Sequence, residues 1–146
     1  MKKVLVLLVI SLLLVGCVGG GGVSLTDDEK IHRTLDRFEN AIANGNENLL
    51  ASLVTDPVNL NIGYGLESME KEIFIQLVKL GWLMTDIEVY ELRSRNILRG
   101  STQATVQYQL YVKANIEGTI DIYESDTELV MRKVGDNWLI ETLNEL

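Results

Sequence analysis

The stretch Ala104-Thr105-Val106-Gln107-Tyr108-Gln109-Leu110-Tyr111-Val112-Lys113-Ala114 has the clearest alternation in the chain. Apolar residues occupy every even position, and the odd positions are mostly polar, which is the period of a β-strand with one buried face. The odd side, which carries Gln107, Gln109 and Tyr111, is expected to face water or a partner. The stretch therefore predicts a long strand in a sheet that covers a core on one side.

The chain after Trp82 contains only strand patterns. Turn residues separate these patterns, and Gly135-Asp136-Asn137 is a three-residue hairpin loop. Trp138, which follows that loop, is expected to pack in the core across the sheet. The predicted strands cover residues 87–92, continued or followed by 97–98, then 104–114, then 119–123 and 128–134 as one bent strand or two, and finally 138–143.

The chain before Trp82 begins with two helix patterns. Thr26 and Glu29 have the spacing of a capping box at a helix start. Apolar residues then recur at spacings of four, three and four, which gives one buried stripe that ends at Asn44-Gly45. A short second helix is expected from Asn46 to about Asp56. The buried stripe of the first helix consists of Ile31, Leu35, Phe38 and Ile42.

A strand and a third helix are expected to complete this half of the chain. Residues 58–64 alternate between apolar and polar side chains, as in a half-buried strand. Ser68 can begin a helix that Gly81 ends. The predicted buried face of this helix consists of Met69, Ile73, Leu77 and Leu80.

Helices followed by antiparallel strands predict an α+β fold. The segments 41–56 and 129–140, and the order of elements from Asp27 to Leu143, resemble the nuclear transport factor 2-like superfamily, the steroid isomerase-like cone fold. The resemblance implies a cystatin-like arrangement, in which N-terminal helices pack in a curved antiparallel sheet around an apolar pocket. Members of that superfamily include isomerases, dehydratases and binding modules, so the fold does not decide the function.

The N-terminal segment has the layout of a signal peptide. Two lysines precede a twelve-residue apolar run, which as a helix of about 18 Å is too short for a bilayer core of about 30 Å. Leu14-Val15-Gly16-Cys17 resembles the lipobox of bacterial lipoproteins. The resemblance implies removal of residues 1–16 and acylation of Cys17 with chains such as palmitate. An ordinary signal peptide followed by a free thiol is the alternative.

Acylation of Cys17 would place the protein outside the cytoplasm on a bacterial membrane. This is the outer membrane in a diderm organism and the cell membrane in a monoderm one. Residues 17–25 form a glycine-rich tether, of which Val18–Ser24 spans about 15 Å as a flexible coil. Residues 26–146 are expected to form a single domain.

The charge balance of the chain is acidic, with 13 basic and 21 acidic residues and a net charge of −8. Removing residues 1–16 takes away two lysines and leaves 11 − 21 = −10. From this balance we expect no basic patch that attracts anionic lipid, and no nucleic acid as a partner.

The inventory of reactive side chains is small. His32 is the only histidine and is expected to be solvated, and Cys17 is committed to lipid, so neither a metal site nor a cofactor is expected. Isomerases of the resembling superfamily take a carboxylate base from the strand after the second helix, where this chain has Asn59, Asn61 and Tyr64. An amide cannot act as a general base near pH 7, so we expect no catalysis; Asp121 is the alternative base.

The sequence thus predicts a lipid-anchored cell-envelope protein with a non-catalytic binding or interaction domain. The alternative is a small lyase or isomerase that acts on an apolar compound in the cone pocket. A surface made of Gln107, Gln109 and Tyr111 could instead form a homodimer or dock on an envelope protein. The residues expected to line the pocket, unless they are plain core, are Phe38, Tyr64, Trp82, Tyr108 and Met131.

Overall fold

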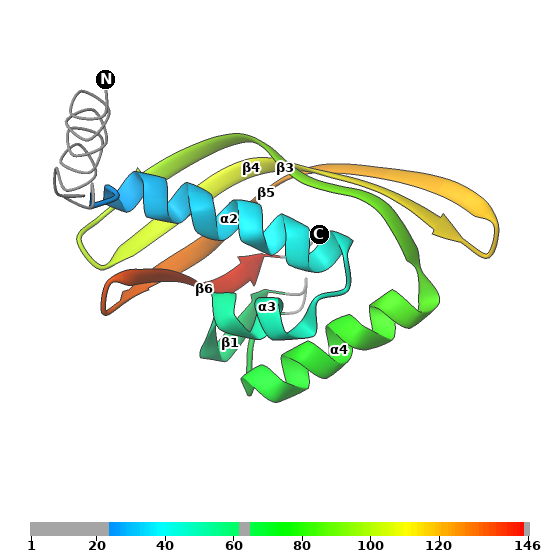
Figure 1. Ribbon diagram of the computed structural model, residues 1–146, viewed down its shortest axis with the longest axis horizontal. Helices are drawn as coiled ribbons and strands as arrows, with labels where there is room; N and C mark the ends of the chain where they lie inside the picture. Colours follow the sequence, from blue (N-terminus) through cyan, green and yellow to red (C-terminus); the bar gives the residue numbers. More distant parts are fainter. Residues whose placement is uncertain (1–23, 62–64, 145–146) are drawn as a thin grey trace, which may run out of the picture.

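The computed structural model describes residues 24–61 and 65–144 (Figure 1). This part of the chain contains three helices and a six-stranded sheet of order β2-β1-β6-β5-β4-β3. The α+β prediction is confirmed. The elements are α2 (Asp27–Ala43), α3 (Glu47–Leu53), β1 (Val54–Asn61), β2 (Leu66–Met69), α4 (Lys71–Met84), β3 (Asp86–Arg99), β4 (Gln103–Ile116), β5 (Thr119–Val134) and β6 (Asn137–Asn144).

Strands β3 to β6 form the expected antiparallel meander. Strand β1 joins it in parallel to β6, and β2 pairs with β1 at the edge. Strand β5 is a single strand and not two, because β4 pairs with it continuously from Ile116↔Thr119 to Gln103↔Arg132. The sheet is strongly curved, and α2 lies across its concave side (Figure 1).

The core lies between α2, α3 and the concave face of the sheet. The predicted stripe of α2 is confirmed, because Ile31 and Leu35 are fully buried and Phe38 is 2% exposed. The even positions of β4 meet this stripe from the sheet side, with Val106 and Leu110 fully buried. Trp138 is 1% exposed and belongs to the same cluster, as predicted.

The start of α2 forms a capping box. The Thr26 hydroxyl accepts a hydrogen bond from the Glu29 amide at 3.3 Å, and the Glu29 carboxylate accepts one from the Thr26 amide at 2.7 Å. The hydrogen bonds from Thr26 lower the pKa of the Glu29 carboxyl group. Two otherwise unpaired backbone amides are therefore satisfied at the positive end of the helix.

A bulge in β3 fixes the middle of α2 on the sheet. Ser94 has φ of 52°, and the register between β3 and β4 shifts between Arg93 and Asn96. The shift turns Arg95 toward α2, where its guanidinium contacts Asp36 at 2.6 Å and Glu39 at 2.8 Å. Because Arg95 is 12% exposed, these contacts hold the helix at one position along the strand.

The predicted buried face of the third helix is wrong. Met69 ends β2, and Ile73, Leu77 and Leu80 are 48 to 55% exposed. The helix packs instead through Phe74, Ile75, Val78 and Trp82, and it continues past Gly81 to Met84. Apolar residues occupy both sides of α4, so periodicity alone could not show which side is buried.

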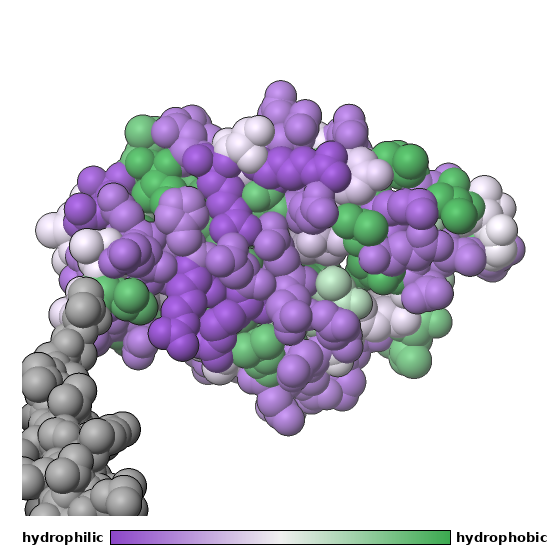
Figure 2. Space-filling model, turned by 45° about the horizontal axis from the view of Figure 1, so that its top comes forward, coloured by the Kyte–Doolittle hydropathy of each residue, from purple (hydrophilic) through white to green (hydrophobic). Residues whose placement is uncertain are grey.

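Large apolar side chains also remain exposed where the β4–β5 hairpin projects beyond the helices. Ile116, Ile120, Ile122 and Tyr123 are each more than 40% exposed there. Figure 2 shows apolar spots at this end of a face that is otherwise mostly polar. Of the helices in residues 24–61 and 65–144, none is long and apolar enough to span a bilayer.

Candidate functional site

An apolar groove opens at the edge of the core, where the end of α2, the last turns of α4 and strands β3 and β4 meet. It has a volume of about 290 Å³ and a lining that is almost entirely apolar. Such a lining suits an apolar ligand, because contact with it removes hydrocarbon surface from water on both sides. The groove is lined by Ile42, Val78, Gly81, Trp82, Thr85, Ile87, Tyr90 and Val112.

Trp82 forms a fixed wall of this groove. Its indole N–H donates a hydrogen bond of 2.9 Å to the backbone oxygen of Ile42. The ring also lies over the turn between α2 and α3, where Gly45 has φ of 61° and a Cβ would lie 3.8 Å from the ring. The hydrogen bond and the close packing keep the indole from rotating into the groove.

Gly81 lines the same groove and leaves space beside α4. A Cβ built on this residue meets no atom within 4 Å, so the groove has free space directly beside the helix backbone. Glycine inside a helix is destabilising by about 1 kcal/mol relative to alanine. The residue therefore keeps space in the groove at some expense in helix stability.

Among the lining residues, Thr85 and Tyr90 have a polar group in the side chain, a hydroxyl in each. Burial raises the pKa of Tyr90 far above its usual range, with smaller effects from Tyr108 and Glu39, so its hydroxyl stays protonated. The ring of Tyr90 meets Phe38 edge to face, with centroids 6.2 Å apart. The lining described here contains no carboxylate, histidine or amine that could act as a general base.

The residues predicted to line a pocket are mostly part of the core. Phe38 and Met131 are buried in the hydrophobic cluster. Tyr108 is 5% exposed, and burial raises its pKa to about 12. Tyr64 lies outside the described residues, and of the other four Trp82 alone lines the apolar groove.

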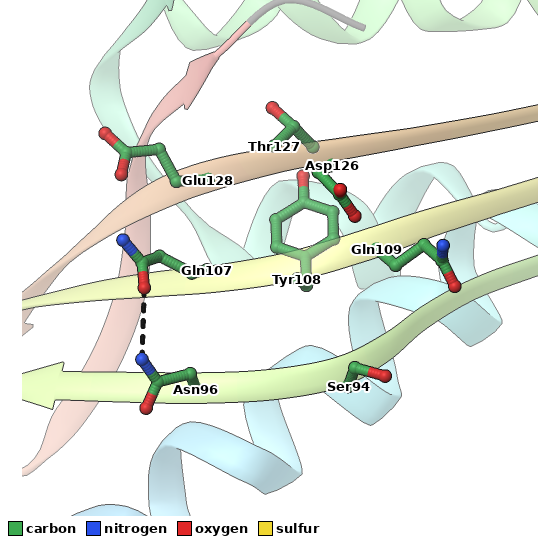
Figure 3. A pocket seen from close by; sticks show the side chains of 8 residues that line it. All are labelled: Ser94, Asn96, Gln107, Tyr108, Gln109, Asp126, Thr127 and Glu128. Atoms are coloured by element: carbon green, nitrogen blue, oxygen red, sulfur yellow. Dashed lines mark hydrogen bonds between the residues drawn. The ribbon is translucent and has the colours of Figure 1, made fainter.

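The surface predicted for interactions carries a separate, polar hollow of about 600 Å³ (Figure 3). Gln107 and Gln109 lie in it on β4, and the Asn96 amide donates a hydrogen bond of 3.0 Å to the Gln107 side-chain oxygen. Tyr111, the third predicted residue, does not line the hollow; the Arg93 guanidinium lies 3.6 Å above its ring. The hollow is lined by Ser94, Asn96, Gln107, Tyr108, Gln109, Asp126, Thr127 and Glu128.

The acidic residues at the start of α2 have structural partners. Asp27 pairs with Lys133 at 2.9 Å and Asp28 with Arg99 at 2.7 Å. Lys133 in particular lowers the pKa of Asp27. Within residues 24–61 and 65–144, no group of three or more metal-ligating side chains is close enough to hold an ion. His32 and Asp121 are exposed, and neither lines the apolar groove.

No family model and no curated protein matches this chain. Solved structures do match. An NTF2-like protein from Cytophaga hutchinsonii is 17% identical, with a TM-score of 0.69 over 82% of this chain and 97% of that one. A conserved protein from Planctomyces limnophilus is 20% identical, with a TM-score of 0.69 over 82% and 94%. An NTF2-like protein with a cystatin-like fold from Novosphingobium aromaticivorans is 14% identical, with a TM-score of 0.67 over 81% and 79%.

These likenesses show that the chain has the NTF2-like, cystatin-like fold that the sequence resembles. Identities of 20% or less carry no information about ligand or activity.

Proposed function

We propose that this chain is a lipid-anchored protein of the bacterial cell envelope whose domain binds an apolar ligand without chemical change. The observation that supports ligand binding is the apolar groove beside Trp82. Its volume of about 290 Å³ is just below the usual range for ligand sites, about 300 to 1,000 Å³, so a small ligand is expected. A small hydrocarbon, an aromatic compound or part of an acyl chain fits this description.

A lyase or isomerase reaction has less support. Proton transfer needs a base within hydrogen-bond reach of the substrate. The described lining offers only neutral hydroxyls, and Tyr90 is the wrong group for a base near pH 7, because burial raises its pKa. Asp121, the carboxylate considered as a substitute, pairs with Ala114 near the tip of the β4–β5 hairpin and does not line the groove.

Binding to the groove should be independent of pH between about 5 and 9, because no lining residue titrates there. We expect a thermal-shift screen of small apolar compounds to find ligands for a chain that begins at Ser24. A ligand at 100 times its Kd should stabilise the fold by about 2.7 kcal/mol at every pH and be recovered unaltered. Conversion of a ligand to a product, with loss of turnover in Asp121→Asn, would instead support the enzyme.

Acylation of Cys17 gives a second test of the proposal, independent of the first. Cys17→Ser should leave an unprocessed precursor that keeps residues 1–16, whereas the wild-type chain should be cut before Cys17 and partition into detergent. Mass spectrometry of the N-terminal peptide measures both. Recovery of the wild-type chain in the aqueous phase with a free thiol would contradict the anchor but not the groove.

The hollow on the outer face of the sheet favours a second candidate function, docking of another protein. Its lining combines amides of Gln107 and Gln109 with carboxylates of Asp126 and Glu128, which can form hydrogen bonds to a polar partner. The partner that docks in this hollow could be a second copy of the chain or another envelope protein. The mass of the full chain in solution, measured by light scattering, separates a homodimer from a monomer.

A further inference from the structure

Of the eleven lysines and arginines in residues 24–61 and 65–144, nine have an ion-pair or hydrogen-bond partner. Eight lysines and arginines form ion pairs within the domain, and the Lys71 ammonium donates to the Ala51 carbonyl oxygen at 3.3 Å. Arg33 and Arg37 are different. In residues 24–61 and 65–144 neither side chain has an ion-pair or hydrogen-bond partner, and both are exposed.

These two arginines lie one turn apart on α2 and line the same groove. The groove has a volume of about 400 Å³ and runs between α2 and the β5–β6 turn. Figure 1 shows the start of α2 and this turn at the same end of the molecule. Arg37 also lines an adjoining hollow of about 270 Å³, with Ser52 and Asn137. The first groove is lined by Ser24, Leu25, Lys30, Arg33, Thr34, Arg37, Asp136, Asn137 and Trp138.

The lining of this groove has a positive formal charge although the chain is acidic. Lys30, Arg33 and Arg37 outnumber Asp136, which pairs with Lys30 at 2.5 Å, so the local balance is 3 − 1 = +2 in a chain of net charge −8. Like charges four residues apart on a helix destabilise it. The charge balance of the whole chain, from which no basic patch is expected, does not show this local cluster of three basic residues.

The walls of the groove are fixed. The Thr34 hydroxyl donates a hydrogen bond of 3.0 Å to the Trp138 backbone oxygen, and this bond joins α2 to β6 directly beneath the arginines. The Lys30–Asp136 pair joins the same helix to the β5–β6 turn. The backbone that carries Arg33 and Arg37 is thus held against β6 and the β5–β6 turn, which limits the entropy lost on binding to that of the arginine side chains.

We propose that Arg33 and Arg37 bind the phosphate group of a phosphate ester in this groove. Planar guanidinium groups match the oxygens of phosphate with two parallel hydrogen bonds each. The groove is larger than a bare phosphate ion needs, which leaves space for the esterified group, and the Asn137 side chain offers a further polar contact.

A phospholipid headgroup is the favoured source of this phosphate. Leu25, which is 37% exposed, lies beside the arginines and gives the apolar contact that a membrane interface provides. The choice of a lipid also rests on the proposed acylation of Cys17, because the seven residues from Val18 to Ser24 can span about 25 Å at most. The phosphate site itself does not depend on the anchor or on the apolar groove.

Arginine-specific modification tests the site in the full chain. The chain is treated with phenylglyoxal in a phosphate-free maltoside detergent, and the modification rate of each arginine is measured by peptide mass spectrometry. Inorganic phosphate is added in one arm, and in the other the chain is placed in nanodiscs of phosphatidylcholine and phosphatidylglycerol. Arg93 and Arg132, which are exposed but paired with Glu91 and Glu141, are internal references.

We expect the modification of Arg33 and Arg37 to slow by about fivefold or more in the nanodiscs, with less than about twofold change at the references. Protection in nanodiscs alone identifies the lipid headgroup, and protection by inorganic phosphate alone identifies a soluble phosphate compound. Protection in neither arm overturns the site.

Two variants separate a fork-shaped contact from general charge attraction. Arg37→Lys keeps the charge but loses the planar fork, so the protection of Arg33 should weaken about tenfold in whichever arm, nanodiscs or inorganic phosphate, protects the wild-type chain. The double variant Arg93→Gln/Lys113→Gln removes two positive charges elsewhere, from side chains on β3 and β4. It should leave the protection of Arg33 unchanged. Equal weakening by both would contradict a specific site.

Discussion

Replacing Trp138 with alanine is expected to lower the free energy of unfolding by about 3 to 5 kcal/mol, the range for large-to-small changes in a core. Trp138 is 1% exposed, belongs to the main cluster and is among the largest fully buried side chains. Its loss leaves a cavity between β6 and α2, where Thr34 is bonded to the Trp138 carbonyl oxygen. Such a loss is a large part of the 5 to 15 kcal/mol typical of a domain.

Urea titration of a chain beginning at Ser24 measures this loss. Tyr123→Ala is the matched control, because Tyr123 is an aromatic residue on the same sheet but 44% exposed, and should change the stability by less than about 1 kcal/mol. If Trp138→Ala lowered the free energy of unfolding by less than about 1 kcal/mol, the result would contradict the packing of Trp138 in the core and indicate that its side chain lies at the surface.

Filling the apolar groove is expected to abolish ligand binding without harming the fold. Gly81→Leu places a large side chain where a Cβ meets no atom within 4 Å, so the new side chain occupies the ligand's space. The affinity for an apolar ligand should fall more than about thirtyfold, as expected for a direct clash. Stability should stay the same or rise, because leucine is a better helix former than glycine.

Gly81→Ala is the control for this variant. It adds a single methyl group, should raise the stability by about 1 kcal/mol, and should change the affinity by less than about threefold. Calorimetric titration of both variants gives the affinities. Unchanged affinity in a folded Gly81→Leu variant would show that the ligand binds elsewhere, and the polar hollow around Gln107 and Gln109 would become the leading site.

The strands after Trp82 could be predicted from the sequence because their alternation has a single interpretation, whereas β2, which contains Ser68, was missed because Ser68 can also begin a helix. Every even position from Ala104 to Leu110 is buried, as the period of two requires. The apolar stripe and the capping box of α2 could also be predicted, because each depends only on residues that are close together in the sequence. In α4 the local signal failed, since a helix that is apolar on both sides can pack through either, and contact with α3 and β1 decides between them.

The groove could be predicted only through Trp82. Its other walls, such as Val78, Ile87 and Val112, have the same apolar character as core residues, and only the tertiary arrangement leaves them half-exposed. Conversely, Phe38 and Met131 fill the core, which is the alternative to a pocket lining that the sequence leaves open for them. An aromatic or apolar residue in a sequence does not show whether the space beside it is filled.

The positive groove was hidden for a different reason. An acidic residue lies within four positions along the chain of each of its cations, Lys30, Arg33 and Arg37. The net charge of this stretch of sequence therefore does not indicate a positive site. In the structure Asp36 turns to Arg95, and Asp27 and Asp28 turn to Lys133 and Arg99. These acidic residues thus pair with other cations, and Arg33 and Arg37 remain unpaired among the residues described.

Tryptophan fluorescence tests the central claim, ligand binding beside Trp82, most directly. The chain has two tryptophans, so Trp138→Phe leaves Trp82 as the only indole, and Trp82→Phe leaves the buried Trp138. A brominated analogue of a ligand from the thermal-shift screen, which quenches an indole that it touches, is titrated into each chain. We predict saturable quenching of Trp82 at the Kd found by calorimetry, and none of Trp138; a ligand that binds and leaves the emission of Trp82 unchanged would contradict the proposed function.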